Sequence, residues 1–158
     1  VAEKIRDNTR TLAVALTSCA HPVTGETMFE MPDDQIEIGM GVHGEVGMGR
    51  QKLVSADATI DLMLPPILED LPFQSGDEVL VLLNNSGSMT LMELFILYRR
   101  VAERLDAAGI RVYRSWIGAY ATTQETAGFA LSLCRVDDEL KRLWDAPANG
   151  AYLKMVAP

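Results

Sequence analysis

The most regular pattern of apolar and polar residues lies in the second half of the chain. Residues 78–83 (Glu-Val-Leu-Val-Leu-Leu) form a nearly continuous apolar run, typical of a strand that is covered on both faces. Residues 90–93 (Thr-Leu-Met-Glu) form a capping box, which opens a predicted helix over 90–107. Helical spacing places seven residues on one side of this helix: Leu91, Leu94, Phe95, Tyr98, Val101, Ala102 and Leu105.

A further apolar segment follows directly. Gly109 is suited to end the helix, and residues 110–117 read as the next strand. Strand 78–83, helix 90–107 and strand 110–117 together predict one βαβ unit, with parallel strands and a right-handed crossover.

The first half of the chain shows weaker patterns. Residues 1–18 carry Ile5, Leu12, Ala13 and Leu16 at helical spacing, which predicts an amphipathic helix. Residues 29–32 read as a short strand, and 35–40 as a second one, because Ile36 and Ile38 alternate with polar neighbours.

Two further helices and a last strand complete the prediction. Ser55 caps a helix through Met63, and Pro65-Pro66 is expected to break or kink it. The alternation at Phe129, Leu131 and Leu133 predicts a strand. Asp137 caps a short helix with three residues inside: Leu140, Leu143 and Trp144. With no internal repeat and no linker, residues 1–158 are expected to form a single α/β domain, with a mixed sheet and flanking helices.

A glycine-rich stretch follows the strand at 35–40. Four glycines bracket His43 and Glu45: Gly39, Gly41, Gly44 and Gly47. Glycine permits positive φ and close backbone approach at an entropic cost, so this density indicates an unusual loop. From composition and spacing alone, a structural and a functional role for His43 are about equally favoured. Gly39, Gly41 and Gly44 also match the dinucleotide fingerprint, but the residues that follow do not resemble a helix, so we set that match aside.

Composition excludes several kinds of partner. The formal net charge is −8 and the isoelectric point is about 4.7, which disfavours nucleic acid and anionic membranes. Apolar residues make up 48 % of the chain, yet no run is long enough to span a bilayer. Cys19 and Cys134 have no metal-type spacing, and we expect no bound metal and a reducing, cytoplasmic setting. The N-terminus lacks an initiator Met, and we expect the chain to be a fragment of a longer protein.

Two polar loops are weaker candidates for a site. Residues 84–87 (Asn-Asn-Ser-Gly) follow a buried strand and precede a helix, where ligands bind in open α/β sheets. Residues 122–126 form another polar connection. An ordinary turn is slightly favoured for the first loop, and a solvated connection is favoured for the second.

Several blocks together resemble a known family. Residues 37–45 (Glu-Ile-Gly-Met-Gly-Val-His-Gly-Glu) resemble the G-x-G-x-H-G-E signature of the substrate-binding (K) domain of dihydroxyacetone kinases. Residues 14–19 (Val-Ala-Leu-Thr-Ser-Cys), the Asn84-Asn85 block with the helix after it, and residues 128–147 resemble further blocks of that domain, in the same order. The similarity covers nearly the whole chain.

The resemblance implies specific roles at the glycine-rich stretch. His43 would bond covalently to the carbonyl carbon of dihydroxyacetone as a hemiaminal, and Gly41, Gly44 and Glu45 would bind the substrate. A neutral imidazole is a competent nucleophile near pH 7. Only a ketone or aldehyde forms such an adduct, so glycerol would be rejected. Val46, where the family usually has Pro, and Ser86, where Leu is frequent, are departures that would reshape the pocket for another small ketose, such as a four-carbon one.

The resemblance also implies partners. The family's K domain is about twice as long, and this chain resembles its C-terminal half only. Phosphoryl transfer would use ATP-Mg, or a nucleotide held on a partner L domain or subunit; this fragment is expected to bind neither, since no G-x-x-x-x-G-K-[ST] P-loop occurs in it. We also expect a homodimer. An alternative from another class is a non-catalytic ligand-binding or regulatory module of the same fold.

Overall fold

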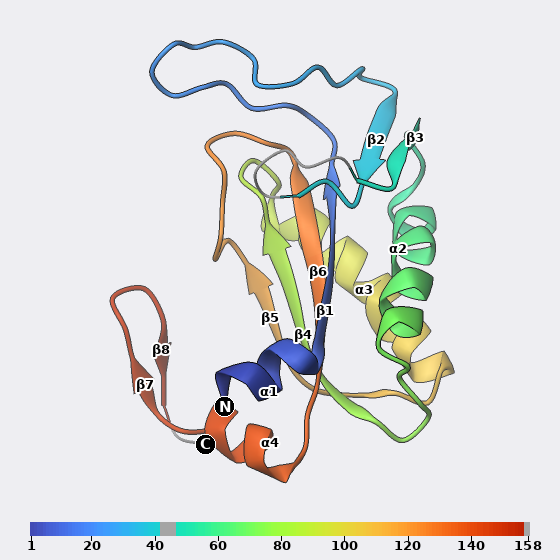
Figure 1. Cartoon of the computed structure of the whole chain (residues 1–158), viewed down its shortest axis with the longest axis vertical. Helices are drawn as coiled ribbons and strands as arrows, with labels where there is room; N and C mark the ends of the chain where they lie inside the picture. Colours follow the sequence, from blue (N-terminus) through green and yellow to red (C-terminus); the bar gives the residue numbers. More distant parts are fainter. Residues whose placement is uncertain (42–46, 157–158) are drawn as a thin grey trace.

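The computed structural model describes residues 1–41 and 47–156. Its helices lie around one main sheet, and a small separate hairpin lies near the C-terminus (Figure 1). The elements are α1 (Ala2–Asp7), β1 (Thr9–Ala15), β2 (Gln35–Ile38), β3 (Gly49–Lys52), α2 (Ala56–Asp70), β4 (Glu78–Asn85), α3 (Leu91–Ala107), β5 (Arg111–Gly118), β6 (Gly128–Arg135), α4 (Asp138–Trp144), β7 (Ala148–Asn149) and β8 (Lys154–Met155).

The sheet is mixed, as predicted. Its strand order is β3-β2-β1-β6-β4-β5, with β4 and β5 parallel and the other neighbours antiparallel. Helix α3 connects β4 to β5, which confirms the βαβ unit. The Thr90–Glu93 capping box is formed, and the Thr90 N–H and hydroxyl lower the pKa of the Glu93 carboxyl by donating to it. Gly109 ends the helix with φ of +71°.

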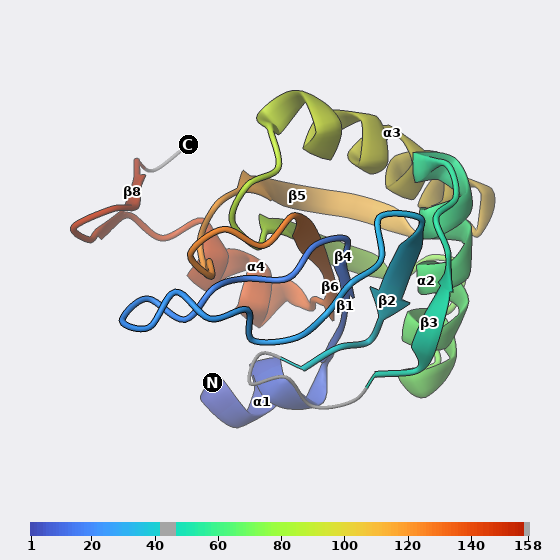
Figure 2. The same cartoon turned by 90° about the horizontal axis from the view of Figure 1, so that it is seen from above.

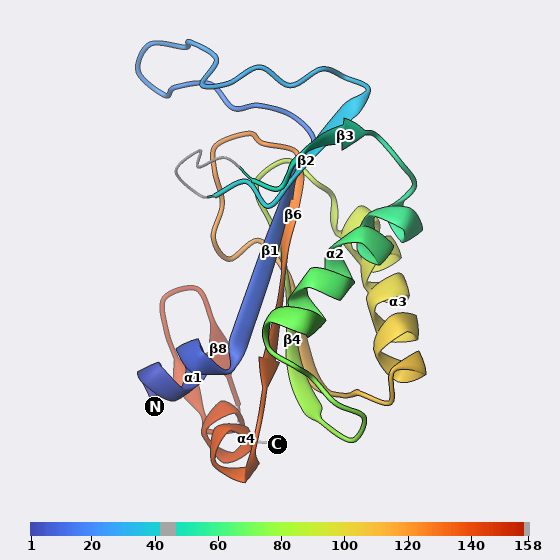
Figure 3. The ribbon, with the colours of Figure 1, turned by 45° about the vertical axis from the view of Figure 1, so that its right-hand side comes forward.

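Helices α2 and α3 pack side by side on one face of the sheet and enclose the core (Figure 3). Alternate strand residues face them, including Val79, Val81 and Leu83 of β4, as the period of a strand requires. On α3 the predicted inner face needs a correction: Leu91 and Phe95 are each 55 % exposed, whereas Leu97 is buried. The helix has apolar residues over more of its surface than the sheet covers.

The opposite face of the sheet is only partly covered. The short helices α1 and α4 lie over one end of it (Figure 3), and beside them a groove of about 450 Å³ remains between Ile5, Leu80, Leu82, Trp116 and Trp144. The rings of Trp116 and Trp144 lie 4.2 Å apart, centre to centre. Within the described ranges, no helix is long and apolar enough to cross a membrane.

The prediction of a helix over residues 1–18 is wrong. Only Ala2–Asp7 is helical, and Thr9–Ala15 forms β1 in the middle of the sheet. β1 pairs with β6 along its whole length and with β2 at its end. Apolar residues at helical spacing in a short segment also suit a strand, so pairing with distant strands decided between the two.

The strand predicted over 29–32 is also absent. These residues belong to a long connection between β1 and β2, which extends from the body on the same side as the β7–β8 hairpin (Figure 2). β2 pairs with β1 through Glu37 and Ile38 and with β3 along its whole length, and residues 29–32 pair with no strand.

Two helix predictions need smaller corrections. Of the break or kink predicted at Pro65-Pro66, the break does not occur: α2 begins at its Ser55 cap and continues through both prolines to Asp70. Leu64 and Ile67, buried on either side of the prolines, anchor the helix to the sheet and offset the lost hydrogen bonds. In α4, Leu140 is buried, but Leu143 is 36 % exposed and lines the groove rather than the core.

Candidate functional site

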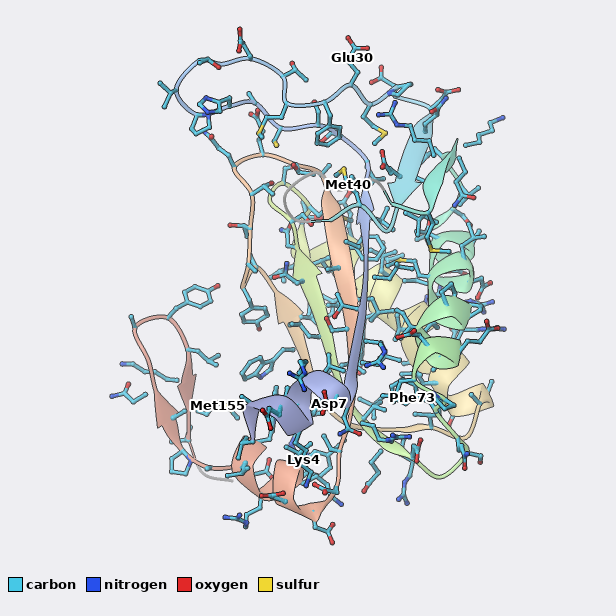
Figure 4. The ribbon with its side chains drawn as sticks, in the orientation of Figure 1. Lys4, Asp7, Glu30, Met40, Phe73 and Met155 are labelled. Carbon is cyan, nitrogen blue, oxygen red and sulfur yellow. The ribbon has the colours of Figure 1, made fainter. Side chains whose placement is uncertain are left out.

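The glycine-rich stretch connects β2 to β3 as the two arms of a hairpin. Residues 39–41 and 47–48 are described at its two ends; the predicted site residues His43, Gly44 and Glu45 lie outside the described residues. Gly41 is described and half-buried. Met40 lies near the upper ends of β1 and β6 (Figure 4). The structure therefore shows where the stretch is attached to the sheet.

Main-chain hydrogen bonds close the base of this hairpin. The Met48 N–H donates to the Ile38 carbonyl at 2.7 Å, and the Gly39 N–H donates to the Ala13 carbonyl on β1, also at 2.7 Å. Gly39 has φ of +81°, a conformation that residues with a Cβ rarely adopt. The turn out of β2 therefore requires glycine at this position.

Gly47 is required for a different reason. A Cβ at this position would lie 2.4 Å from the Ile38 oxygen and 2.6 Å from the Gly39 carbonyl carbon and the Met40 nitrogen. All three are main-chain atoms, so no flexible side chain can move away to make room. Two of the four glycines thus hold the strands close together at the base.

Replacing Gly47 by alanine is expected to lower the free energy of unfolding by about 2 kcal/mol or more, because the backbone must move to admit the methyl group. Chemical denaturation would measure the loss. Gly150→Ala is the matched control, since its Cβ would meet only the Leu153 oxygen at an ordinary 3.4 Å. Equal losses of unfolding free energy in the two variants would contradict the conclusion that Gly47 has no space for a Cβ.

Glu37 lies next to this base and was not singled out from the sequence. It is only 8 % exposed. Its carboxylate accepts from Arg50 Nε at 3.2 Å and is 3.5 Å from the Gly47 nitrogen, whose N–H points at it. The alternation of residues 36–38 showed that Glu37 faces away from its two isoleucines, which was the available signal, but burial of that second face depends on the tertiary structure.

The loop at the end of β4 is organised by two buried asparagines. Asn84 accepts from the main-chain N–H groups of Tyr120 and Ala121 and donates to the Ala121 carbonyl. Asn85 accepts from Gly87 and Met89 and donates to the Met89 carbonyl. Both amides are engaged in holding main chain, which is what the turn interpretation of residues 84–87 expects.

Replacing Asn84 by alanine is expected to lower the free energy of unfolding by about 1–3 kcal/mol, because it leaves several main-chain groups unpaired. Hydrogen exchange at the Tyr120 and Ala121 amides should become faster. Asn149→Ala, at an exposed position in the small hairpin, serves as the control. Unchanged exchange at both amides would contradict the role given to Asn84.

The second polar connection packs against the first. Thr123 donates to the Ser86 carbonyl through both its N–H, at 2.6 Å, and its hydroxyl, at 2.9 Å. The Glu125 carboxylate accepts from the Ala20 N–H at 2.7 Å, which ties in the long connection after β1. Residues 122–125 are exposed, as a solvated connection requires, while Thr126 is buried and the hydrogen bonds tie the segment to its neighbouring loops.

These segments meet at one edge of the sheet. Ala15 at the end of β1 pairs with Gly128, and Asn85 at the end of β4 pairs with Phe129. The glycine-rich stretch begins from the strand beside β1, so its described ends lie close to the carboxyl edge of the sheet, as Met40 does in Figure 4. This is the edge at which open α/β sheets bind ligands. Among the residues that the structure describes, no three His, Cys, Asp or Glu side chains group as a metal site.

Comparison with known proteins defines the class. Residues 1–152 match the Dak1 domain family. The chain is 40 % identical, over 98 % of its length, to the dihydroxyacetone-binding subunit DhaK of PTS-dependent dihydroxyacetone kinase 2 from Listeria innocua, and it covers 46 % of that protein. It is 35 % identical to the L-erythrulose kinase of Pectobacterium atrosepticum over 94 % of the chain and 26 % of the relative.

A solved structure with similar architecture is the dihydroxyacetone kinase operon co-activator Dha-DhaQ. It has a TM-score of 0.84 and 26 % identity, over 92 % of this chain and 46 % of that one. The chain spans about half the length, or less, of these relatives. It belongs to the Dak1 domain family. That the chain corresponds to the C-terminal half of the longer domain stays a prediction.

Proposed function

We propose that this chain is the ketose-holding part of a kinase that phosphorylates dihydroxyacetone or a related small ketose. The observation that carries the proposal is the match to the Dak1 family over residues 1–152, in a chain whose glycine-rich stretch is anchored near the carboxyl edge of the sheet. The Listeria relative is a dihydroxyacetone-binding subunit, which supports the same ligand class here.

In this proposal His43 captures the ketose covalently. A neutral ring nitrogen adds to the carbonyl carbon, the carbonyl π electrons move to oxygen, and the oxygen gains the proton that the other ring nitrogen loses. The product is a hemiaminal that retains every atom of the ketose. Gly41, Gly44 and Glu45 would contact the captured substrate. Because polyols have no carbonyl group, the step itself selects ketoses over glycerol.

The size of the pocket determines whether a three-carbon or a four-carbon ketose is bound. One relative named above is an L-erythrulose kinase and another binds dihydroxyacetone, so this family accommodates both three-carbon and four-carbon ketoses. Val46 and Ser86 depart from the family pattern and are the positions at which we expect this protein to be adapted. Competition between the two ketoses for capture would show which is preferred.

Phosphoryl transfer would need groups from outside this chain. We propose that ATP-Mg, or a nucleotide held on an L domain or subunit, supplies the phosphoryl group to a hydroxyl of the captured ketose. The metal would neutralise charge on the phosphates during transfer. The proposal also includes a homodimer. It places the protein in the cytoplasm, a reducing setting with which the two free cysteines are consistent.

Capture is tested most directly by mass. The full-length protein is incubated with carbonyl-¹³C dihydroxyacetone and followed by intact mass spectrometry and ¹³C NMR. A hemiaminal adds the whole mass of the ketose and converts the carbonyl carbon to a tetrahedral one, whereas a lysine Schiff base would lose water. Glycerol is the negative control. Absence of any protein-bound tetrahedral carbon would contradict the proposal.

The similarity to an operon co-activator favours a second function, a non-catalytic regulatory module. The acidic chain, with a net charge of −8, would suit protein partners rather than DNA. Transfer of phosphate to ketose by the full-length protein with its nucleotide partner distinguishes the two. Ketose binding without turnover would support the regulatory module.

A further inference from the structure

Glu37 is an unusual residue for its position. Among the described residues it is the only ionisable side chain in the buried class, at 8 % exposed, and its neighbours Ile36 and Ile38 are 0 % and 6 % exposed. Burying a carboxylate is unfavourable unless hydrogen bonds and an opposite charge compensate it. An apolar or β-branched residue would form the same strand at no such cost. The sheet alone therefore does not explain a glutamate here.

The contacts of Glu37 converge on the base of the hairpin. Arg50 lies directly opposite it in the β2–β3 register and donates to one carboxylate oxygen at 3.2 Å. The Gly47 N–H points at the other oxygen, with a nitrogen-to-oxygen distance of 3.5 Å. The carboxylate thus connects β2 to the returning arm of the glycine-rich stretch at two places.

Both arms are also constrained by their main chain. Gly39 leaves β2 with φ of +81°, and Gly47 packs against the Ile38 oxygen with no space for a Cβ. His43 lies midway between these two glycines in the sequence. The two fixed glycines are therefore the described ends of the stretch that carries the imidazole.

We propose that Glu37, paired with Arg50, is a positioning residue for ketose capture: it fixes the Gly47 end of the stretch relative to β2, four residues along the chain from His43. The inference rests on the proposed function of His43. Bond formation is sensitive to such placement, since an error of about 1 Å can cost on the order of 100-fold in rate. Glu37 acts through Gly47 and need not touch the substrate.

The test measures capture of carbonyl-¹³C dihydroxyacetone by the full-length protein, as the ketose concentration that gives half-maximal adduct and the rate of adduct formation. Glu37→Leu removes the charge and both acceptors, and is expected to slow capture about tenfold or more. Glu37→Gln keeps an oxygen that can accept from Gly47, and is expected to lie between Glu37→Leu and wild type. This order distinguishes positioning from general stability.

Glu103→Gln is the matched control. It breaks ion pairs of 2.7 and 3.2 Å to Arg99 and Arg100 on α3, far from the hairpin in sequence, and should leave capture unchanged. All variants are compared at a temperature at which thermal melting shows them fully folded. If Glu37→Leu does not fold, the rate of adduct formation in Glu37→Gln decides whether Glu37 has the positioning role.

The outcomes separate the two proposals. No adduct in the wild-type protein would overturn the proposed function and this inference with it. An adduct in wild type that forms as fast in the folded Glu37 variants would overturn the positioning role alone. A reduced rate in Glu103→Gln equal to that in the Glu37 variants would also overturn it, because the effect would then reflect stability.

Discussion

Replacing His43 by alanine is expected to abolish covalent capture of the ketose in the full-length protein and to weaken its preference for ketoses over polyols, while the fold is kept. The reason is chemical: alanine has no nucleophilic nitrogen, so any residual ketose binding is non-covalent and no longer requires a carbonyl group. Intact mass spectrometry with labelled dihydroxyacetone would show the loss of the adduct. Binding of glycerol relative to dihydroxyacetone, by calorimetry, would show the loss of preference.

The same variant distinguishes a functional from a structural histidine. A residue in a glycine-rich segment between two strand ends is expected to contribute little to the core. Near-wild-type unfolding free energy, with no adduct, is therefore the expected combination. A loss comparable to a core truncation, roughly 2–5 kcal/mol, would instead identify His43 as structural. His21→Ala is a suitable control, because that imidazole is exposed in the connection after β1 and accepts from the nearby main-chain N–H groups of Val23 and Thr24.

The second large effect concerns the 158-residue chain by itself, which is expected to show no ketose-dependent ATP consumption. Phosphoryl transfer depends on positioning and on cationic groups and metal around the phosphates. The sequence contains no P-loop, and the chain spans about half, or less, of the relatives it resembles. The chain therefore has the proposed nucleophile without a nucleotide site of evident kind.

A coupled assay with purified chain, dihydroxyacetone and ATP-Mg measures this directly. Turnover on the order of 1–100 per second without an added subunit would contradict the expectation. The full-length protein with its nucleotide-bearing partner is the positive control. Circular dichroism and thermal melting of the 158-residue chain are needed beside the assay, so that inactivity is measured on folded protein. The continuous core between the sheet, α2 and α3 gives reason to expect folding.

Predictions from the sequence succeeded where structure is determined locally. The capping box at Thr90, the cap at Ser55 and the terminating Gly109 were correct because each forms within one turn of chain. β4 and α3 were found because their apolar patterns are long enough to distinguish strand from helix. The resemblance to dihydroxyacetone kinases was likewise carried by contiguous blocks, and the family match confirms it.

The errors share a physical origin. Thr9–Ala15 became a strand because β6 and β2 supply hydrogen-bond partners from distant parts of the chain. Phe95 is exposed because the sheet covers less of α3 than its apolar pattern suggests. α2 continues through two prolines because burial on both sides of them holds it.

The sequence by itself determined the α/β class, the βαβ unit, the family and the candidate nucleophile, since these depend on local propensity and on contiguous motifs. Only the tertiary structure decided that Asn84 and Asn85 hold main chain, that Gly47 has no room for a Cβ, and that Glu37 is buried between Arg50 and the Gly47 N–H. Each of these depends on which distant segment lies against the residue, because burial and pairing are set by the packing of strands that are far apart in the sequence.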